Sequence, residues 1–104
     1  MMASKSKILS VIHQDAKDLH KIGLMDEMTM REFDAVCLPP VKEFSAKQIK
    51  RIRTKHKASQ AVFAAFLNTS KSTIQKWEQG QKKPNGPSLK LLNLVEQKGL
   101  EALA

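Results

Sequence analysis

The stretch that decides the fold runs over residues 59–80 and reads SQAVFAAFLNTSKSTIQKWEQG. Ser59 and Ser70 are suitable N-caps for two short helices, because a serine side chain accepts a hydrogen bond from a free N–H of the first turn. Asn68-Thr69-Ser70 predicts a tight corner between them, and Gly80 suits the end of the second helix because glycine adopts the left-handed conformation readily. Two short helices joined in this way are typical of a helix-turn-helix, whose second helix enters the major groove of DNA.

Each of these two helices is expected to bury one apolar face. The face of the first is expected to consist of Val62, Phe63, Phe66 and Leu67. On the second helix, Ile74 and Trp77 lie three residues apart and are expected to pack onto the first. Ala64 is expected where the two helices approach most closely, so a larger side chain there would overpack the crossing.

Two further helices are predicted to flank this pair. Ser45 is expected to begin one of them, with Ile49 and Ile52 buried. Its basic side chains are expected to stay outside: Lys47, Lys50, Arg51, Arg53 and Lys55. Pro87 suits the first turn of the other helix, which contains Leu89, Leu91, Leu92, Leu94 and Val95. With a short terminal turn, residues 45–104 are predicted to form a bundle of four to five helices.

A join is predicted between this helix-turn-helix domain, residues 45–104, and an N-terminal arm, residues 1–36. The intervening residues 37–44 contain Pro39 and Pro40. Prolines lack a backbone donor and push the preceding residue toward extended conformations. The sequence therefore predicts a linker here.

The arm is predicted to contain one amphipathic helix over about residues 4–22, with Ser4 or Ser6 as N-cap and Gly23 as its stop. Its apolar stripe consists of Ile8, Leu9, Ile12, Ala16, Leu19 and Ile22. Residues 28–33 alternate only partly between apolar and polar, so a short strand, a loop and a helix all stay open there. A lone amphipathic helix cannot bury its stripe by itself, so the arm needs a partner.

Charge divides the chain in the same way. Residues 1–44 carry six Lys or Arg and seven Asp or Glu, a net charge of −1, whereas residues 45–104 carry twelve and three, a net charge of +9. Nucleic-acid binding needs such a basic domain, because Lys and Arg displace counterions from phosphates. A basic solvated surface is the alternative. Hydrophobic residues make up 41% of the chain, which excludes wholesale disorder.

The helix-turn-helix stretch resembles the Xre/Cro family of repressors. The matching residues are Ser59-Gln60, Phe63-Ala64, Leu67, Thr69-Ser70, Ser72-Thr73-Ile74, Trp77-Glu78, Gly80, Pro84 and Leu91-Leu92. The resemblance implies a mainly α, lambda-repressor-like bundle that binds double-stranded operator DNA. It also implies that Lys71, Ser72 and Lys76 read base edges, and lysine can indeed donate to guanine O6 and N7. Thr73 and Gln75 are expected to reach bases as well.

Other residues are expected to hold the DNA backbone. In the resemblance, Gln60 is a backbone clamp at the start of the first helix of the pair that can also touch an edge base. Ser59 and Ser70 lie at helix N-termini, where free N–H groups hold phosphates, and Lys82 and Lys83 are expected to contact phosphates too. One recognition helix reads few base pairs, so we expect a homodimer with half-sites about 34–36 Å apart. The last long helix and the C-terminal tail are either its dimer surface or plain core.

The whole chain also resembles HigA-type antitoxins, with an acidic arm before a Cro-like domain and the run Phe44-Ser45-Ala46 through Ile49 entering it. The resemblance implies that the arm neutralises a HigB-type, mRNA-cleaving toxin and that the protein represses its own operon. The expected apolar toxin contacts are Ile8, Ile12, Leu19, Ile22, Met28, Met30 and Phe33, the last three as an added strand. The expected acidic contacts with a basic toxin surface are Asp15, Asp18, Asp26, Glu27 and Glu32. The alternative is a stand-alone Xre/Cro-type repressor without a toxin partner.

The residue inventory argues against an enzyme, a metal site and a cofactor. The chain has no tyrosine and one cysteine, Cys37, with no histidine near it in the sequence. His13 and His20 lie about 10.5 Å apart along a helix, too far to share a zinc ion, and are expected on its polar face. No apolar run approaches the roughly 20 residues of a membrane span, and the N-terminus does not resemble a secretion signal. The expected location is the cytoplasm, in association with the nucleoid through DNA binding.

Overall fold

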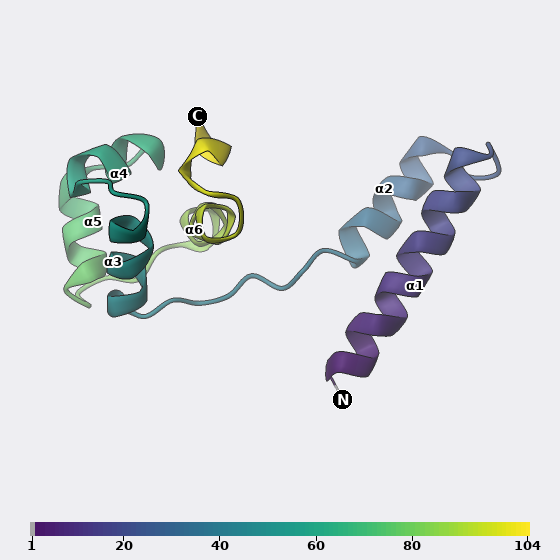
Figure 1. The fold of residues 1–104 in the computed structure, drawn as a ribbon, viewed down its shortest axis with the longest axis horizontal. Coiled ribbons are helices and arrows are strands. Elements are labelled where there is room, and N and C mark those ends of the chain that lie inside the picture. Colours follow the sequence, from purple (N-terminus) through teal and green to yellow (C-terminus); the bar gives the residue numbers. More distant parts are fainter. Residues whose placement is uncertain (1) are drawn as a thin grey trace. The chain divides into compact units, whose positions relative to one another are not determined.

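The computed structural model describes residues 2–104, with side chains from residue 7 onward. It divides into two compact units, one ending at Pro40 and the other spanning Val41–Ala104 (Figure 1). All regular structure in the described residues is helical, which confirms the predicted mainly α class. The elements are α1 (Met2–Lys21), α2 (Glu27–Val36), α3 (Ala46–Lys55), α4 (Gln60–Phe66), α5 (Lys71–Glu78), α6 (Gly86–Lys98) and the 3₁₀ turn η1 (Leu100–Leu103).

The first unit is a hairpin of two helices, α1 and α2, which lie side by side in Figure 1. The predicted helix over residues 4–22 is present, but it begins at Met2, so Ser4 and Ser6 lie inside α1 and neither caps it. Gly23 follows α1 with a φ of +83°, as expected of a helix stop.

The short strand considered for residues 28–33 is wrong, because α2 covers them. Asp26 caps this helix: its carboxylate accepts a hydrogen bond from the backbone N–H of Thr29 at 2.8 Å. Met30, Phe33 and Cys37 recur at the helical spacing of three and four residues, and all three are buried or half-buried. The apparent alternation around Met30 was therefore a short coincidence within a helical pattern.

The two arm histidines bridge the helices instead of lying on a polar face. His13 Nε2 lies 2.6 Å from Asp34 Oδ1, and His20 Nε2 lies 2.7 Å from Glu27 Oε2. Among the side chains that the structure describes in this unit, only Ala16 and Met30 are fully buried apolar ones. The hairpin therefore has a small core, and polar bridges add to it.

The second unit is a bundle of α3–α6 and η1 around one apolar core. Its buried members are Ile49, Ile52, Ala58, Phe63, Ala64, Leu67, Ile74, Trp77, Leu92, Val95 and Leu100. Ser45 begins α3 as predicted, with a capping box that it forms together with Gln48. At α6 the cap is Asn85, and Pro87 lies in the first turn. Local cap signals and the apolar core thus agree on the same bundle.

The start of the second unit is fastened by a buried amide. Asn93, on α6, donates to the backbone carbonyl of Lys42 at 2.9 Å and accepts from the backbone N–H of the same residue at 2.9 Å. It also donates to the carbonyl of Leu89 at 2.8 Å. Lys42, which falls in the predicted linker 37–44, is therefore packed as part of the second unit.

Candidate nucleic-acid interface

Two serine caps and a tight corner set the geometry of α4 and α5. The hydroxyl of Ser59 accepts from the N–H of Val62 at 3.2 Å, and the hydroxyl of Ser70 accepts from that of Thr73 at 3.1 Å. Asn68 occupies the left-handed region with a φ of +55°, which lets the chain turn sharply between the helices. Both serines are engaged with their own helices in the structure, while their side chains remain exposed.

The face that α5 presents to solvent carries the predicted base readers. Ile74 and Trp77 are buried, which fixes the rotation of the helix. Lys71, Ser72 and Lys76 are exposed as a result. The structure thus leaves these three side chains on the solvent-exposed side of α5.

Two other predicted readers are less free. Thr73 is half-buried, and its hydroxyl lies 2.9 Å from that of Ser70, so the two form a hydrogen bond. Gln75 is also half-buried. Ser70 and Thr73 therefore support the first turn of α5 before any ligand is present.

The predicted apolar face of α4 is partly wrong. Phe63, Ala64 and Leu67 are buried, but Val62 is 46% exposed and Phe66 is 36% exposed. A helix of seven residues turns only one narrow face toward its neighbours, and each residue is rotated by about 100° from the next. Val62 and Phe66 therefore form an outer edge one residue away from the buried pair.

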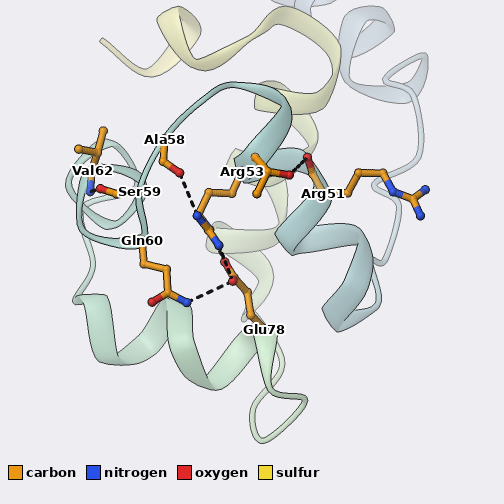
Figure 2. Close-up of polar contacts among 8 residues, drawn as sticks. Arg51, Arg53, Ala58, Ser59, Gln60, Val62 and Glu78 are labelled. Atoms are coloured by element: carbon orange, nitrogen blue, oxygen red, sulfur yellow. Dashed lines mark hydrogen bonds and ion pairs between the residues drawn. The ribbon is translucent and has the colours of Figure 1, made fainter.

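A polar network joins α3, α4 and α5 (Figure 2). Arg53 donates to both carboxylate oxygens of Glu78, from Nε at 2.6 Å and from Nη2 at 2.9 Å, and to the carbonyl of Ala58 at 3.0 Å. The amide of Gln60 donates to Oε1 of Glu78 at 3.2 Å. The predicted backbone clamp is therefore held in place by the same carboxylate that receives Arg53.

The exposed position predicted for Arg53 is wrong. Its side chain is only 12% exposed and that of Glu78 only 5%, whereas Arg51 points away from the network in Figure 2. Burial alone would raise the pKa of Glu78, but the hydrogen bonds from Arg53 and Gln60 outweigh burial and hold that pKa below its ordinary value. The carboxylate is thus kept ionised.

Sequence reasoning gave Glu78 no role, although one signal was present. Glu78 is the only acidic residue between positions 45 and 95. A single carboxylate among many cations, directly after the buried Trp77, is a candidate for an internal ion pair. Its partner lies 25 residues away in the sequence, so only the fold identifies it.

Exposed cations lie on and around the elements of this interface. Four of them lie on α5 or in the loop after it: Lys71, Lys76, Lys82 and Lys83. Four more lie on α3: Lys47, Lys50, Arg51 and Lys55. In the part of the chain that the structure describes, none of these eight side chains forms an ion pair. They are available to anionic ligands.

The first unit presents apolar side chains outward. Most of the predicted partner contacts are exposed: Ile8, Ile12, Leu19, Ile22 and Met28. Phe33 is half-buried. Met30 is only 5% exposed, because it packs between α1 and α2, so the expected role of Met30 as an outer contact does not fit this structure.

Among the described residues, no three His, Cys, Asp or Glu side chains lie close enough together to hold a metal ion. No helix in that part of the chain is both long and apolar enough to cross a membrane.

Comparison with known proteins agrees with the geometry of the second unit. Residues 49–95 match the family model described as Helix-turn-helix. The chain is also 44% identical over 52 residues to Antitoxin HigA-2 of Vibrio cholerae serotype O1 (strain ATCC 39315 / El Tor Inaba N16961). This match covers 50% of the chain and 50% of that protein, so the chain spans about half the length of the curated relative.

Proposed function

We propose that this chain is a cytoplasmic antitoxin that represses its own operon, because residues 49–95 match the helix-turn-helix family model and half of the chain is similar to an antitoxin. The DNA-binding part of this proposal rests on the solvent-exposed side of α5. Lys71, Ser72 and Lys76 are exposed there, and neither lysine forms an ion pair within the described residues. This part of the function needs no catalytic step and no cofactor.

Operator recognition divides into base reading and backbone contact. Lys71, Ser72 and Lys76 would enter the major groove, where lysine can donate to guanine O6 and N7. Thr73 and Gln75 would lie at the edge of this contact because they are half-buried. The backbone contacts would come from Gln60 and from the helix N-termini at Ser59 and Ser70, together with Lys82 and Lys83.

A homodimer would place two recognition helices on one operator. Half-sites about 34–36 Å apart fit the two-fold arrangement typical of such proteins. The candidate dimer surfaces are α6, the C-terminal tail and the exposed apolar edge of α4 formed by Val62 and Phe66.

The first unit would neutralise a HigB-type toxin. Its support is the similarity to an antitoxin over half the chain together with an exposed apolar surface on a hairpin that buries few side chains of its own. Contiguous exposed apolar surface of this kind marks sites of protein association.

A deletion separates the two activities. A variant that lacks residues 1–40 keeps the whole apolar core of the second unit, and we expect it to bind the operator but to lose toxin neutralisation in a growth-rescue assay. Full rescue by the truncated chain would contradict the arm assignment. If the full chain binds operator but no toxin encoded beside its gene, the protein is a stand-alone repressor.

A further inference from the structure

The structure sorts the acidic side chains of the first unit into two groups. Asp26 caps α2. Glu27 pairs with His20 at 2.7 Å and with Arg31 at 3.2 Å. Asp34 pairs with His13 and Arg31. These three carboxylates therefore stabilise the hairpin itself.

The other group is not used in this way. Asp15 and Glu32 are exposed and form no hydrogen bond or ion pair within the described residues, and Asp18 accepts only an exposed hydrogen bond from Gln14 at 3.0 Å. Of the five carboxylates expected to face a toxin, Asp26 and Glu27 are thus already occupied.

Asp15 lies in the middle of the exposed apolar stripe of α1. At about 100° per residue, positions separated by three, four and seven residues share one side of a helix. Ile8, Ile12, Asp15 and Leu19 follow this spacing, and Ile22 continues it one residue beyond the end of α1. The four apolar members are each at least 41% exposed. Lys17 and Lys21 fall on another side of the helix, whereas Lys7 borders the N-terminal end of the stripe beside Ile8 and Ile12.

Glu32 borders a groove between α1 and α2 that continues this stripe. The groove has a volume of about 240 Å³ and is lined by Leu9, Ile12, Glu32, Phe33, Val36 and Cys37. Ile12 belongs to both features, so stripe and groove form one surface. Glu32 is the only charged residue in the lining of the groove.

We infer that this surface, which we call the stripe–groove surface, binds an apolar segment of the toxin that carries Lys or Arg side chains opposite Asp15 and Glu32. The inference rests on the proposed function. A carboxylate surrounded by contacting apolar groups loses its water, and this loss is costly unless a cation or several donors replace the water. A purely apolar partner would leave Asp15 without compensation.

The same charges argue against a second copy of this chain as the occupant. In a two-fold contact each copy presents the same patch to the other. Asp15 and Glu32 of both copies would then share one interface, and the two Lys7 side chains that border the stripe would not balance these four carboxylates. An excess of like charge at an interface is costly. A basic partner fits both the apolar and the acidic features.

The test measures toxin binding by the full-length chain, using the purified toxin encoded beside its gene, by calorimetry at two salt concentrations. Asp15→Asn and Gln14→Lys form a matched pair, because each raises the net charge by one on adjacent exposed positions of α1. We expect Asp15→Asn to weaken binding about tenfold or more and to reduce its salt dependence. Glu32→Gln should act in the same direction, whereas Asp15→Glu should retain most of the affinity.

Other outcomes would overturn the inference in recognisable ways. Equal affinities for Asp15→Asn and Gln14→Lys would show that position on the stripe does not matter. If sedimentation shows that the unaltered chain associates with itself and that deletion of residues 1–40 abolishes this association, a second copy is the occupant. If the unaltered chain binds no toxin while operator binding persists, the proposed antitoxin function fails before the charge question arises. Circular dichroism of each variant identifies any loss caused by unfolding.

Discussion

Replacing Glu78 by leucine is expected to destabilise the second unit by about 3 kcal/mol. Removing one partner of a buried ion pair typically costs about 3–5 kcal/mol, because the other charge remains without compensation. The lower end applies here, since the side chain of Arg53 is 12% exposed and keeps its hydrogen bond to Ala58. Gln60 also loses its acceptor, but its amide is only half-buried.

A double-mutant cycle distinguishes the ion pair from general packing. Arg53→Met should cost a similar amount, because Glu78 is 5% exposed and would retain only Gln60 as a partner. The double variant should be more stable than either single variant, since it removes both charges together. The expected coupling energy is at least about 2 kcal/mol. Arg51→Met, an exposed change on the same helix, should stay within about 0.5 kcal/mol of the parent.

The assay is urea unfolding followed by the fluorescence of Trp77. Trp77 is the only tryptophan of the chain and is buried in the core of the second unit, so the signal reports that unit alone. Additive effects of the two single changes, within about 0.5 kcal/mol, would refute the reasoning, because non-interacting sites add.

The same pair predicts how stability depends on pH. Because the folded-state pKa of Glu78 is lowered from an ordinary value of 4.5, its contribution is complete above that pH. The contribution is lost as the pH falls through the lower folded-state pKa. Glu78→Leu should therefore flatten the acid limb of the stability curve.

Three further predictions concern separate contacts. Asn93→Ala should destabilise the second unit by about 1–3 kcal/mol in the Trp77 assay, since both backbone groups of Lys42 lose a buried partner; an effect as small as that of the exposed change Gln97→Ala would argue against this. Lys76→Ala should relax preference at one base position by about 1–3 kcal/mol, whereas Lys82→Ala should weaken binding to all sequences and reduce the salt slope by about 1, both measured by competition binding. Acid should loosen the hairpin below pH 3.8, because the hydrogen bond from His13 lowers the pKa of Asp34; unchanged amide exchange in α2 at pH 3 would contradict this.

The bundle could be predicted because its signals are local. Ser45, Ser59 and Ser70 each cap a helix where the sequence places them. A cap acts over three residues, so its effect is readable without the fold. The predictions that failed depend on packing. Whether Val62 or Phe63 turns inward depends on where α5 lies, and the ion pair of Arg53 joins α3 to a carboxylate on α5.

The N-terminal hairpin was harder to predict because the apolar residues of α1 contribute both to its contact with α2 and to an exposed surface. α1 contributes Ala16 to the contact with α2 and leaves Ile8 and Leu19 outside. A stripe this wide reads as one apolar face in the sequence. Without a strong signal for α2, nothing showed that only part of that face would be covered.

The two units differ in how much of their stability they supply themselves. Eleven buried apolar side chains form the core of the second unit, whereas Ala16 and Met30 are the fully buried ones described in the first. A unit with so little buried surface gains much from any partner that covers its exposed side chains, because binding stabilises the folded state by mass action. The small core that leaves the free hairpin weakly stable therefore also couples its folding to binding at the stripe–groove surface. The second unit has its own core, so α5 keeps its position whether or not that surface is occupied.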